Sequence, residues 1–408
     1  MTHGIIKADL GDAAYRNRLM ARLSAAIDDG ASTLTDLCRA GDGAFPPAVI
    51  DVAREINQHS DVSEWPHRRW PEDALGTEDA GVPSMPEPHP IDFEWRFTAQ
   101  TADVIAALLA QRGGRIGCLG APSVFARLMH RGSDAILIDR NPGLRRHFSA
   151  AWRHRMWTID LACDEIVAPA DSRFPDAARE AIPLFDSMLL DPPWYVNHTL
   201  AWVCRALPWL RPGGRLLLSV FPSLVRPAAE EERDELFRAL RSLGEVRPMP
   251  HRAAYTTPFF ENETLSSFGL ADLGQWRSGD LFEIIVPNTK LRVAHEPTAE
   301  AAWERVQLGR QVIAVRVQDE TRLGAVRVTP INADGSFLLK SVSAREPVRQ
   351  NVSLWTSRNR AAALSGTNTV LAFLRELEKG RSPASVLKEL EREGDRIGLT
   401  LVLAMVGW

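Results

Sequence analysis

The run Asp191-Pro192-Pro193-Trp194, followed by Tyr195, has the clearest chemical potential in this chain. It comes directly after a short apolar run, as expected of a loop that follows a buried strand. Each proline fixes φ and lacks an N–H group, so the carbonyls of this turn are held rigidly. The Asp191 carboxylate and such a carbonyl can accept two hydrogen bonds from one amino group, and Trp194 or Tyr195 can stack on a flat substrate. The pattern indicates a site that binds an amino group and orients the lone pair of its nitrogen, as methyl transfer to nitrogen requires.

A small-residue turn predicts a second part of the site. Gly117, Leu119, Gly120 and Ala121 lie at the end of an expected strand and the start of a helix. Small residues at such a turn let a ligand approach the backbone closely. Asp139 ends the next expected strand, 19 residues after Gly120, which suits an acid that binds two ribose hydroxyls. Each feature alone has a structural explanation, but together with the Asp-Pro-Pro-Trp run they predict a nucleotide-type cofactor site.

The elements that must position these residues follow an alternating pattern. Short apolar runs alternate with helix-like stretches, and the runs fall at residues 115–120, 135–139, 156–161, 187–191, 215–220 and 281–286. Such alternation is typical of a parallel sheet flanked by helices. The sequence therefore predicts an α/β fold with a Rossmann-like sheet over residues 92–290.

A helical module and a linker are expected before this sheet. Apolar residues recur every four positions from Tyr15 to Ile27, and Thr33 opens a capping box, so residues 1–70 predict a helix-turn-helix-like module. Its third helix offers few basic side chains, so we favour packing or substrate docking over DNA reading. Residues 71–91 are rich in proline and acids and predict a linker.

An α+β accessory domain is expected over residues 291–408. Its predicted strands lie at residues 312–317, 324–328 and 337–341, and its predicted helices at 367–378 and 383–393. No group of residues in this part indicates chemistry.

Composition narrows the functional classes. The net charge of −4 gives no overall attraction to nucleic acid. The four cysteines are scattered without the spacing of metal ligands, so we expect reduced thiols, no metal site and a cytoplasmic location. No signal peptide is evident, and the apolar run at 399–408 is too short to span a bilayer, so no membrane partner is expected. The sequence does not indicate an oligomeric state.

Residues 93–286 resemble the class I S-adenosylmethionine-dependent methyltransferases. The Asp-Pro-Pro-Trp run is similar to the motif of members that methylate amino groups. Residues 118–123 and 157–160 are similar to the family of N6-adenine or elongation-factor-lysine methyltransferases, which often has Phe where Trp194 stands. The resemblance implies S-adenosylmethionine as cofactor. It also implies that the glycine segment lines the methionine part, that Asp139 holds the ribose and that Asp160 lies near the adenine.

The resemblance further implies N-methylation of a macromolecule, either adenine in a nucleic acid or lysine in a protein. Asp191 and the Pro192 carbonyl would accept the amino hydrogens. Two other classes stay open. Aminopropyltransferases of branched polyamine synthesis share a winged-helix-like start, a glycine turn and a Rossmann sheet. A non-catalytic module that binds the cofactor or a partner would keep the same motifs.

Overall fold

The computed structural model describes most of the chain, namely residues 13–56, 84–159, 185–270, 273–287, 303–317, 325–390 and 393–407. These residues fall into two compact units. Unit 1 contains the described residues up to Ser84, Trp95–Thr257 and residues 273–287. Unit 2 contains Met85–Glu94, residues 258–270 and the described residues from 303 onward.

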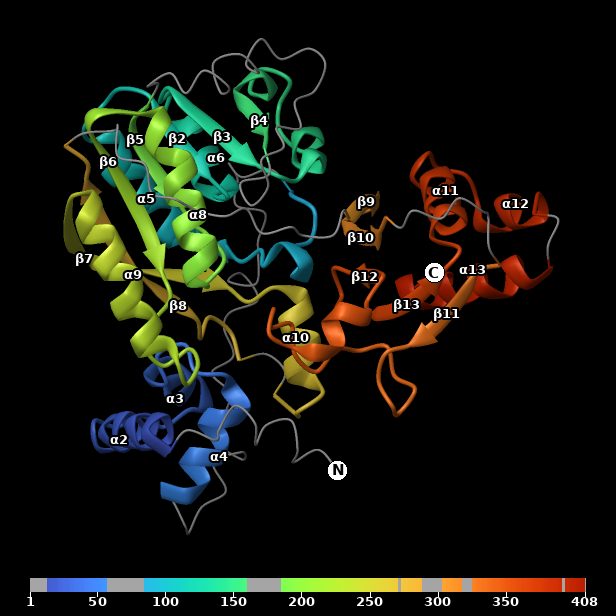
Figure 1. Ribbon diagram of the computed structural model, residues 1–408, viewed down its shortest axis with the longest axis horizontal. Coiled ribbons are helices and arrows are strands. Elements are labelled where there is room, and N and C mark those ends of the chain that lie inside the picture. The colour runs from blue at the N-terminus through green and yellow to red at the C-terminus, as the bar shows by residue number, and fades with distance from the viewer. Residues whose placement is uncertain are drawn as a thin grey trace. The chain divides into compact units, whose positions relative to one another are not determined.

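Unit 1 is built on an eight-stranded sheet with the order β1-β7-β8-β6-β5-β2-β3-β4 (Figure 1). The neighbours β2–β3, β3–β4, β2–β5 and β5–β6 are parallel, and the other pairs are antiparallel. The Rossmann-like α/β fold predicted from the sequence is confirmed. The strands are β1 (Arg96–Phe97), β2 (Ile116–Leu119), β3 (Ala135–Asp139), β4 (Met156–Thr158), β5 (Phe185–Leu190), β6 (Leu210–Val220), β7 (Glu245–Thr256) and β8 (Ser278–Ile285).

The strand order reverses between β2 and β5. The chain runs from β2 outward to β3 and β4, and then returns to β5 on the other side of β2. In sheets of this kind a crevice opens at the reversal, beyond the carboxyl ends of the strands. The loops after β2, β3 and β5 therefore meet at one edge of the sheet.

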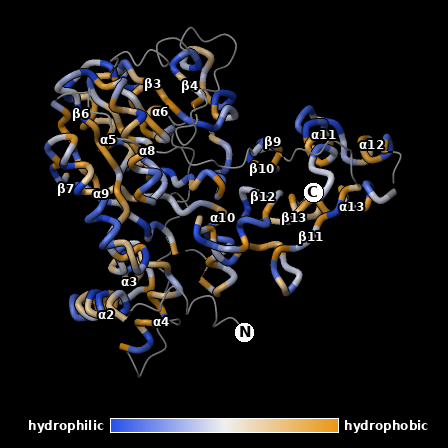
Figure 2. The backbone as a smooth tube through the Cα atoms, in the orientation of Figure 1, coloured by the Kyte–Doolittle hydropathy of each residue, from blue (hydrophilic) through white to orange (hydrophobic). Residues whose placement is uncertain are grey.

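The sheet is covered by helices, which explains why its central strands are apolar throughout. All four residues of β2 are buried, as expected of a parallel strand with both faces covered. Figure 2 shows these strands as mainly hydrophobic segments. Helix α5 packs on α6 and α8 on α9. Their bounds are α5 (Ala99–Ala110), α6 (Pro122–His130), α8 (Val196–Ala206) and α9 (Ala229–Leu243).

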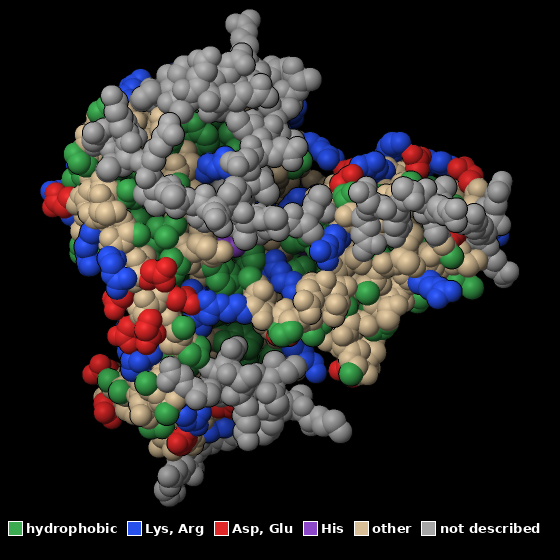
Figure 3. Space-filling model, viewed as in Figure 1, with side chains coloured by type: hydrophobic (Ala, Val, Ile, Leu, Met, Phe, Trp, Pro, Cys, Tyr) green, Lys and Arg blue, Asp and Glu red, His purple; other side chains and the backbone are tan. Residues whose placement is uncertain are grey.

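Helix α9 begins with an acidic turn. Glu230, Glu231 and Glu232 lie where the partial positive charge of the helix N-terminus stabilises carboxylates. Acidic side chains gather over this helix on the face drawn in Figure 3. That part of the surface is unsuited to a nucleic-acid backbone.

The N-terminal helices pack within unit 1. They are α2 (Ala13–Asp28), α3 (Leu34–Ala40) and α4 (Pro46–Ile56), so the helical prediction is confirmed for these residues. The Thr33 hydroxyl caps α3 by accepting from the Asp36 amide at 3.1 Å. The Tyr15 hydroxyl donates to the Leu224 carbonyl at 3.1 Å, and Thr35 donates to the Leu273 carbonyl at 3.2 Å. The described helices thus share one compact unit with the sheet, whereas the sequence predicted a separate module over residues 1–70.

Helix α4 is mostly buried. Val49, Ile50, Val52 and Ala53 are each at most 4% exposed. A helix that reads DNA must present a polar face to a groove. This burial favours the packing interpretation over DNA reading.

Unit 2 combines a five-stranded antiparallel sheet with helices. The strand order is β11-β13-β12-β10-β9. Side chains from β9, β10, β12, α11 and α13 form its main core, so the α+β prediction is confirmed for the described residues. The elements are α10 (Phe259–Ser266), β9 (Trp303–Leu308), β10 (Gln311–Arg316), β11 (Arg327–Pro330), β12 (Leu354–Thr356), β13 (Ala361–Ser365), α11 (Thr367–Glu378), α12 (Pro383–Lys388) and α13 (Glu393–Val406). Short 3-10 turns of both units are η3 (Pro90–Asp92), η4 (Pro142–Arg146), η5 (Arg153–Arg155), η6 (Leu207–Trp209) and η7 (Pro347–Asn351).

Residues 85–94 belong to the packing of unit 2. Ile91 joins a second core cluster with Trp355, and Asp92 forms an ion pair with Arg305 of β9. This end of the expected linker is therefore ordered against the sheet. Residues 71–83 of that linker lie outside the described residues. The strand predicted at 337–341 is wrong, because only one bridge forms there, between Leu338 and Arg360.

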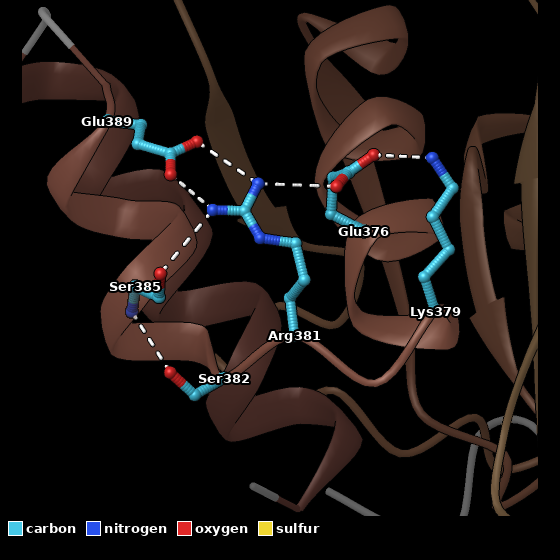
Figure 4. A network of polar contacts seen from close by, with 6 residues as sticks. All are labelled: Glu376, Lys379, Arg381, Ser382, Ser385 and Glu389. Carbon is cyan, nitrogen blue, oxygen red and sulfur yellow. Dashed lines mark hydrogen bonds and ion pairs between the residues drawn. The ribbon is translucent and has the colours of Figure 1, made fainter.

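A surface network joins α11 to α12. The Arg381 side chain pairs with Glu376 and Glu389, and Lys379 also pairs with Glu376 (Figure 4). Exposed ion pairs of this kind contribute little stability each, but together they fix the turn between the helices. Among the residues that the structure describes, no helix has the length and apolar character needed to cross a membrane.

Candidate active site

Asp191 lies directly after β5, at the reversal of the strand order, and is half-buried. Its backbone amide donates to the Leu119 carbonyl at 3.2 Å, which ties it to the end of β2. The Tyr255 hydroxyl of β7 donates to Asp191 Oδ1 at 2.6 Å, and Ser219 Oγ of β6 lies 2.6 Å from the same hydroxyl. The ends of β5, β6 and β7 are therefore joined by one chain of hydrogen bonds.

The protonation of this chain is set mainly by burial. Burial raises the pKa of Asp191 to about 7, against the hydrogen bonds from Tyr255 and Ser219 and the charge of Arg277, which lower it. Burial and the neighbouring Asp191 raise the pKa of Tyr255 well above its usual value, so Tyr255 stays a neutral donor. A carboxyl group that titrates near neutral pH suits a hydrogen-bond acceptor or a base.

Trp194 is enclosed by other side chains. It is 8% exposed, and its ring meets the ring of Tyr255 edge to face at 5.6 Å. The Arg277 guanidinium lies over one ring face, with Cζ at 4.0 Å from the ring centroid. Gly279 of β8 makes room for this ring, because an added Cβ would lie 3.2 Å from Trp194 Cζ2. One face of Trp194 is therefore already covered, and its stacking on a substrate stays a prediction.

The rest of the Asp-Pro-Pro-Trp segment leads into α8. Pro192 is buried and Pro193 is half-buried. The half-buried Tyr195 donates its amide to the Pro193 carbonyl at 2.7 Å and precedes the first residue of α8. Arg226 lies over the Tyr195 ring at 5.2 Å. The structure places these residues beside Asp191 in the chain turn, and their contact with an acceptor stays a prediction.

The turn after β2 approaches Asp191 closely. Gly120 has φ of 65°, and an added Cβ would lie 2.7 Å from Trp202 Cη2 and 3.3 Å from the Asp191 carbonyl. Leu119 and Ala121 are at most 1% exposed, and Ala121 precedes α6. Gly117 lies inside β2, where an added Cβ would be 3.1 Å from Met188 Cε, so its small size serves packing against β5. Cofactor binding by these four residues stays a prediction.

Asp139 ends β3 at the same edge of the sheet. It is half-buried, and its Oδ1 accepts from the Asn141 amide at 2.8 Å. The Gly120 amide donates to the Ile138 carbonyl at 3.0 Å, so the turn after β2 and the end of β3 are neighbours. Asp160 lies outside the described residues.

Two buried polar groups at this edge point to a ligand. Ser123 Oγ, in the first turn of α6, and Asn141 Nδ2, just after β3, are buried without a hydrogen-bond partner within the described ranges. Buried polar atoms are normally satisfied, and a helix N-terminus favours an anion. The residues present therefore fit a nucleoside that carries a carboxylate, as S-adenosylmethionine does.

The sequence patterns did not reveal three residues of this site. Tyr255 and Arg277 come from the antiparallel strand β7 and from the residue before β8, far along the chain from Asp191, and Ser219 comes from the neighbouring strand β6. No local motif marks them. Asn141 carries a weak signal, because it stands two residues after the acid that ends β3.

No protein-family model and no curated protein sequence matches this chain. Among solved structures, it is similar to a predicted O-methyltransferase from Agrobacterium tumefaciens, with 19% identity over 48% of this chain and 84% of that chain and a TM-score of 0.29. TrmN from Thermus thermophilus is 15% identical over 46% and 52% of the two chains, with a TM-score of 0.27. The T. thermophilus 16S rRNA N2 G1207 methyltransferase RsmC is 12% identical over 53% and 45%, also with a TM-score of 0.27. Because these TM-scores lie below 0.5, we infer nothing about activity from them.

Proposed function

We propose that this protein is an S-adenosylmethionine-dependent methyltransferase that acts on an amino nitrogen. One observation carries the proposal: the carboxyl-bearing turn at Asp191 and the glycine turn at Gly120 adjoin at the strand reversal. The Asp191 amide is 3.2 Å from the Leu119 carbonyl, and the Asp191 carbonyl lies 3.3 Å from the position that a Cβ on Gly120 would take. An acceptor held by Asp191 would thus adjoin a ligand held by the glycine turn.

The residues around the glycine turn would each bind a different part of the cofactor. Gly120 would let the backbone approach it, and Ser123 with the N-terminus of α6 would bind its carboxylate. Asp139 would accept hydrogen bonds from its ribose hydroxyls. When bound, S-adenosylmethionine supplies a methyl group already activated by its sulfonium.

Asp191 would orient the acceptor. The Asp191 carboxylate, whose Oδ1 accepts from Tyr255, would accept one amino hydrogen, and the Pro192 carbonyl would accept the other. This arrangement would direct the nitrogen lone pair toward the methyl group that the cofactor supplies, and the Asp191 carboxylate would accept the proton that the nitrogen releases. With an ammonium acceptor, Asp191 would take a proton before transfer, for which a pKa of about 7 is suited. Positioning supplies most of the rate gain in this scheme.

The acceptor class stays a prediction, either adenine in nucleic acid or lysine in protein. The pKa of Asp191 suits an ammonium, whereas the positive charge of Arg277 beside it disfavours one. Cell extract is to be incubated with radiolabelled S-adenosylmethionine and then digested with nuclease or protease. Label released by nuclease identifies nucleic acid, and label released by protease identifies protein. The cytoplasmic location also stays a prediction.

Cofactor binding gives the direct test, by isothermal titration with S-adenosylmethionine. The wild-type protein is expected to bind it, and Gly120→Ala is expected to weaken binding by about tenfold, because the added Cβ would lie 2.7 Å from Trp202 and overpack the turn. Gly132→Ala is the matched control, since Gly132 has φ of 70° and nothing within 4 Å of an added Cβ. Absence of binding by the wild-type protein contradicts the proposal.

A further inference from the structure

We propose that Arg277 is a positioning residue of this site. Its guanidinium, held between the indole rings of Trp95 and Trp194, fixes the segment from Asp191 to Trp194 and keeps a positive charge beside the Asp191 carboxylate. The inference rests on the proposed function only where it concerns turnover.

The guanidinium lies between two aromatic faces. Arg277 Cζ is 4.2 Å from the Trp95 ring centroid and 4.0 Å from that of Trp194, both well within the range of cation–π attraction. Trp95 is supported edge to face by Trp276 at 5.9 Å and Trp194 by Tyr255 at 5.6 Å. A flat cation between two supported rings holds both in place. Movement of Trp194 would therefore require the whole stack to open.

The segment that carries Arg277 is itself anchored. The Leu273 carbonyl accepts from Thr35 Oγ1 at 3.2 Å, and the Gln275 carbonyl accepts from Arg39 Nε at 2.9 Å. Both donors belong to α3. The approach to Arg277 is thus held to the N-terminal helices, which gives the stack a fixed base.

The charge of Arg277 acts on Asp191 against burial. The groups that face Asp191 are the hydroxyls of Tyr255 from β7 and Ser219 from β6, and the guanidinium of Arg277 ahead of β8. The two hydroxyls are neutral donors, so Arg277 is the cation of this set. Without Arg277, less positive charge counteracts the effect of burial on Asp191, so the carboxyl group keeps its proton to higher pH.

The stack also restricts the acceptor. Arg277 covers one face of Trp194, and that indole is only 8% exposed. A flat acceptor could stack on this face only by displacing the guanidinium. This arrangement therefore offers Asp191, rather than the Trp194 face, as the main contact for an amino group.

The test is a titration of the Asp191 carboxyl carbon by ¹³C NMR in cofactor-free protein, assigned with Asp191→Asn. Arg277→Gln is expected to raise the apparent pKa by about one unit, because an opposite charge close by is lost. Arg277→Lys is expected to titrate near the wild type, since it keeps the charge, but to change the tryptophan fluorescence because the flat stack is lost. Arg241→Gln is the matched control, as Arg241 lies 5.8 Å over Phe237 on α9.

The outcomes separate this inference from the proposed function. A folded Arg277→Gln protein whose Asp191 titrates as in the wild type overturns the inference, as does unchanged fluorescence in Arg277→Lys. If the titration shifts but no acceptor is ever methylated, the inference about Asp191 stands and the proposed function fails. If methyl transfer is found, its pH profile is expected to move to higher pH in Arg277→Gln in step with the titration.

Discussion

Asp191 combines burial with a charge that its neighbours only partly support. Burial raises the pKa of its carboxyl group to about 7, from an ordinary value of 3.8. Between these two pH values the folded protein keeps a proton that the unfolded chain has released. The free energy of unfolding therefore falls as the pH rises through this window. A residue kept at such a cost to stability is typical of functional sites.

Asp191→Asn tests this linkage at the residue scale. The amide has no charge to bury, so the variant is expected to be more stable than the wild type by about 1–2 kcal/mol at pH 8, with a smaller gain at pH 5. Urea unfolding at the two pH values measures it. The same variant is expected to lose methyl transfer while still binding S-adenosylmethionine. Equal stability of the two proteins at both pH values contradicts the linkage.

Local pattern explains which site residues could be predicted from the sequence. Asp191, Gly120 and Asp139 each follow an apolar run directly, so the sequence could place them at the ends of strands. Tyr255 reaches Asp191 from 64 positions along the chain, through antiparallel strands whose register no local signal specifies. Arg277 likewise depends on contacts with two distant tryptophans.

Helix α3 acts at the scale of elements by holding the segment ahead of β8. The buried Thr35 hydroxyl donates to the Leu273 carbonyl, four residues before Arg277. Thr35→Val keeps the shape but leaves this carbonyl without its donor, so a loss of about 1–2 kcal/mol in unfolding free energy is expected. Urea unfolding measures it, and near-ultraviolet circular dichroism reports the tryptophan stack. Thr400→Val, whose hydroxyl lies on the exposed side of α13, is the control and is expected to change little. A Thr35→Val protein as stable as the control would argue against this anchoring.

The prediction of an element was correct where the periodicity of its apolar side chains is sufficient to specify it. It was wrong where side-chain hydrogen bonds take the place of those to a neighbouring strand. Helix α11 has the bounds expected from its pattern. The strand expected at 337–341 does not form. There, Asn332 Nδ2 donates to the carbonyls of Ser336 and Leu338 at 3.0 and 2.7 Å, which satisfies acceptors that a neighbouring strand would otherwise bind.

At the scale of the whole molecule, each unit has its own core, so two unfolding transitions are expected in calorimetry. The proposed cofactor residues all belong to unit 1. S-adenosylmethionine at 100 times its dissociation constant would stabilise that unit by about 2.7 kcal/mol and raise only its transition temperature. Leu374→Ala, in the core of unit 2, is expected to lower the other transition. A cofactor shift in the transition that Leu374→Ala lowers contradicts the assignment.

Unit 2 is assembled from three stretches of chain, and the first two of them interrupt unit 1. On the ribosome, Ile91 and Thr264 emerge long before Trp355 and Asn359, which they contact in the finished protein. A nascent chain that ended at residue 290 would lack the later residues that both early stretches contact. Those stretches would then be exposed to chaperones. A fragment that ends at residue 290 is therefore expected to aggregate, whereas a chain that also contains the later residues of unit 2 completes both cores.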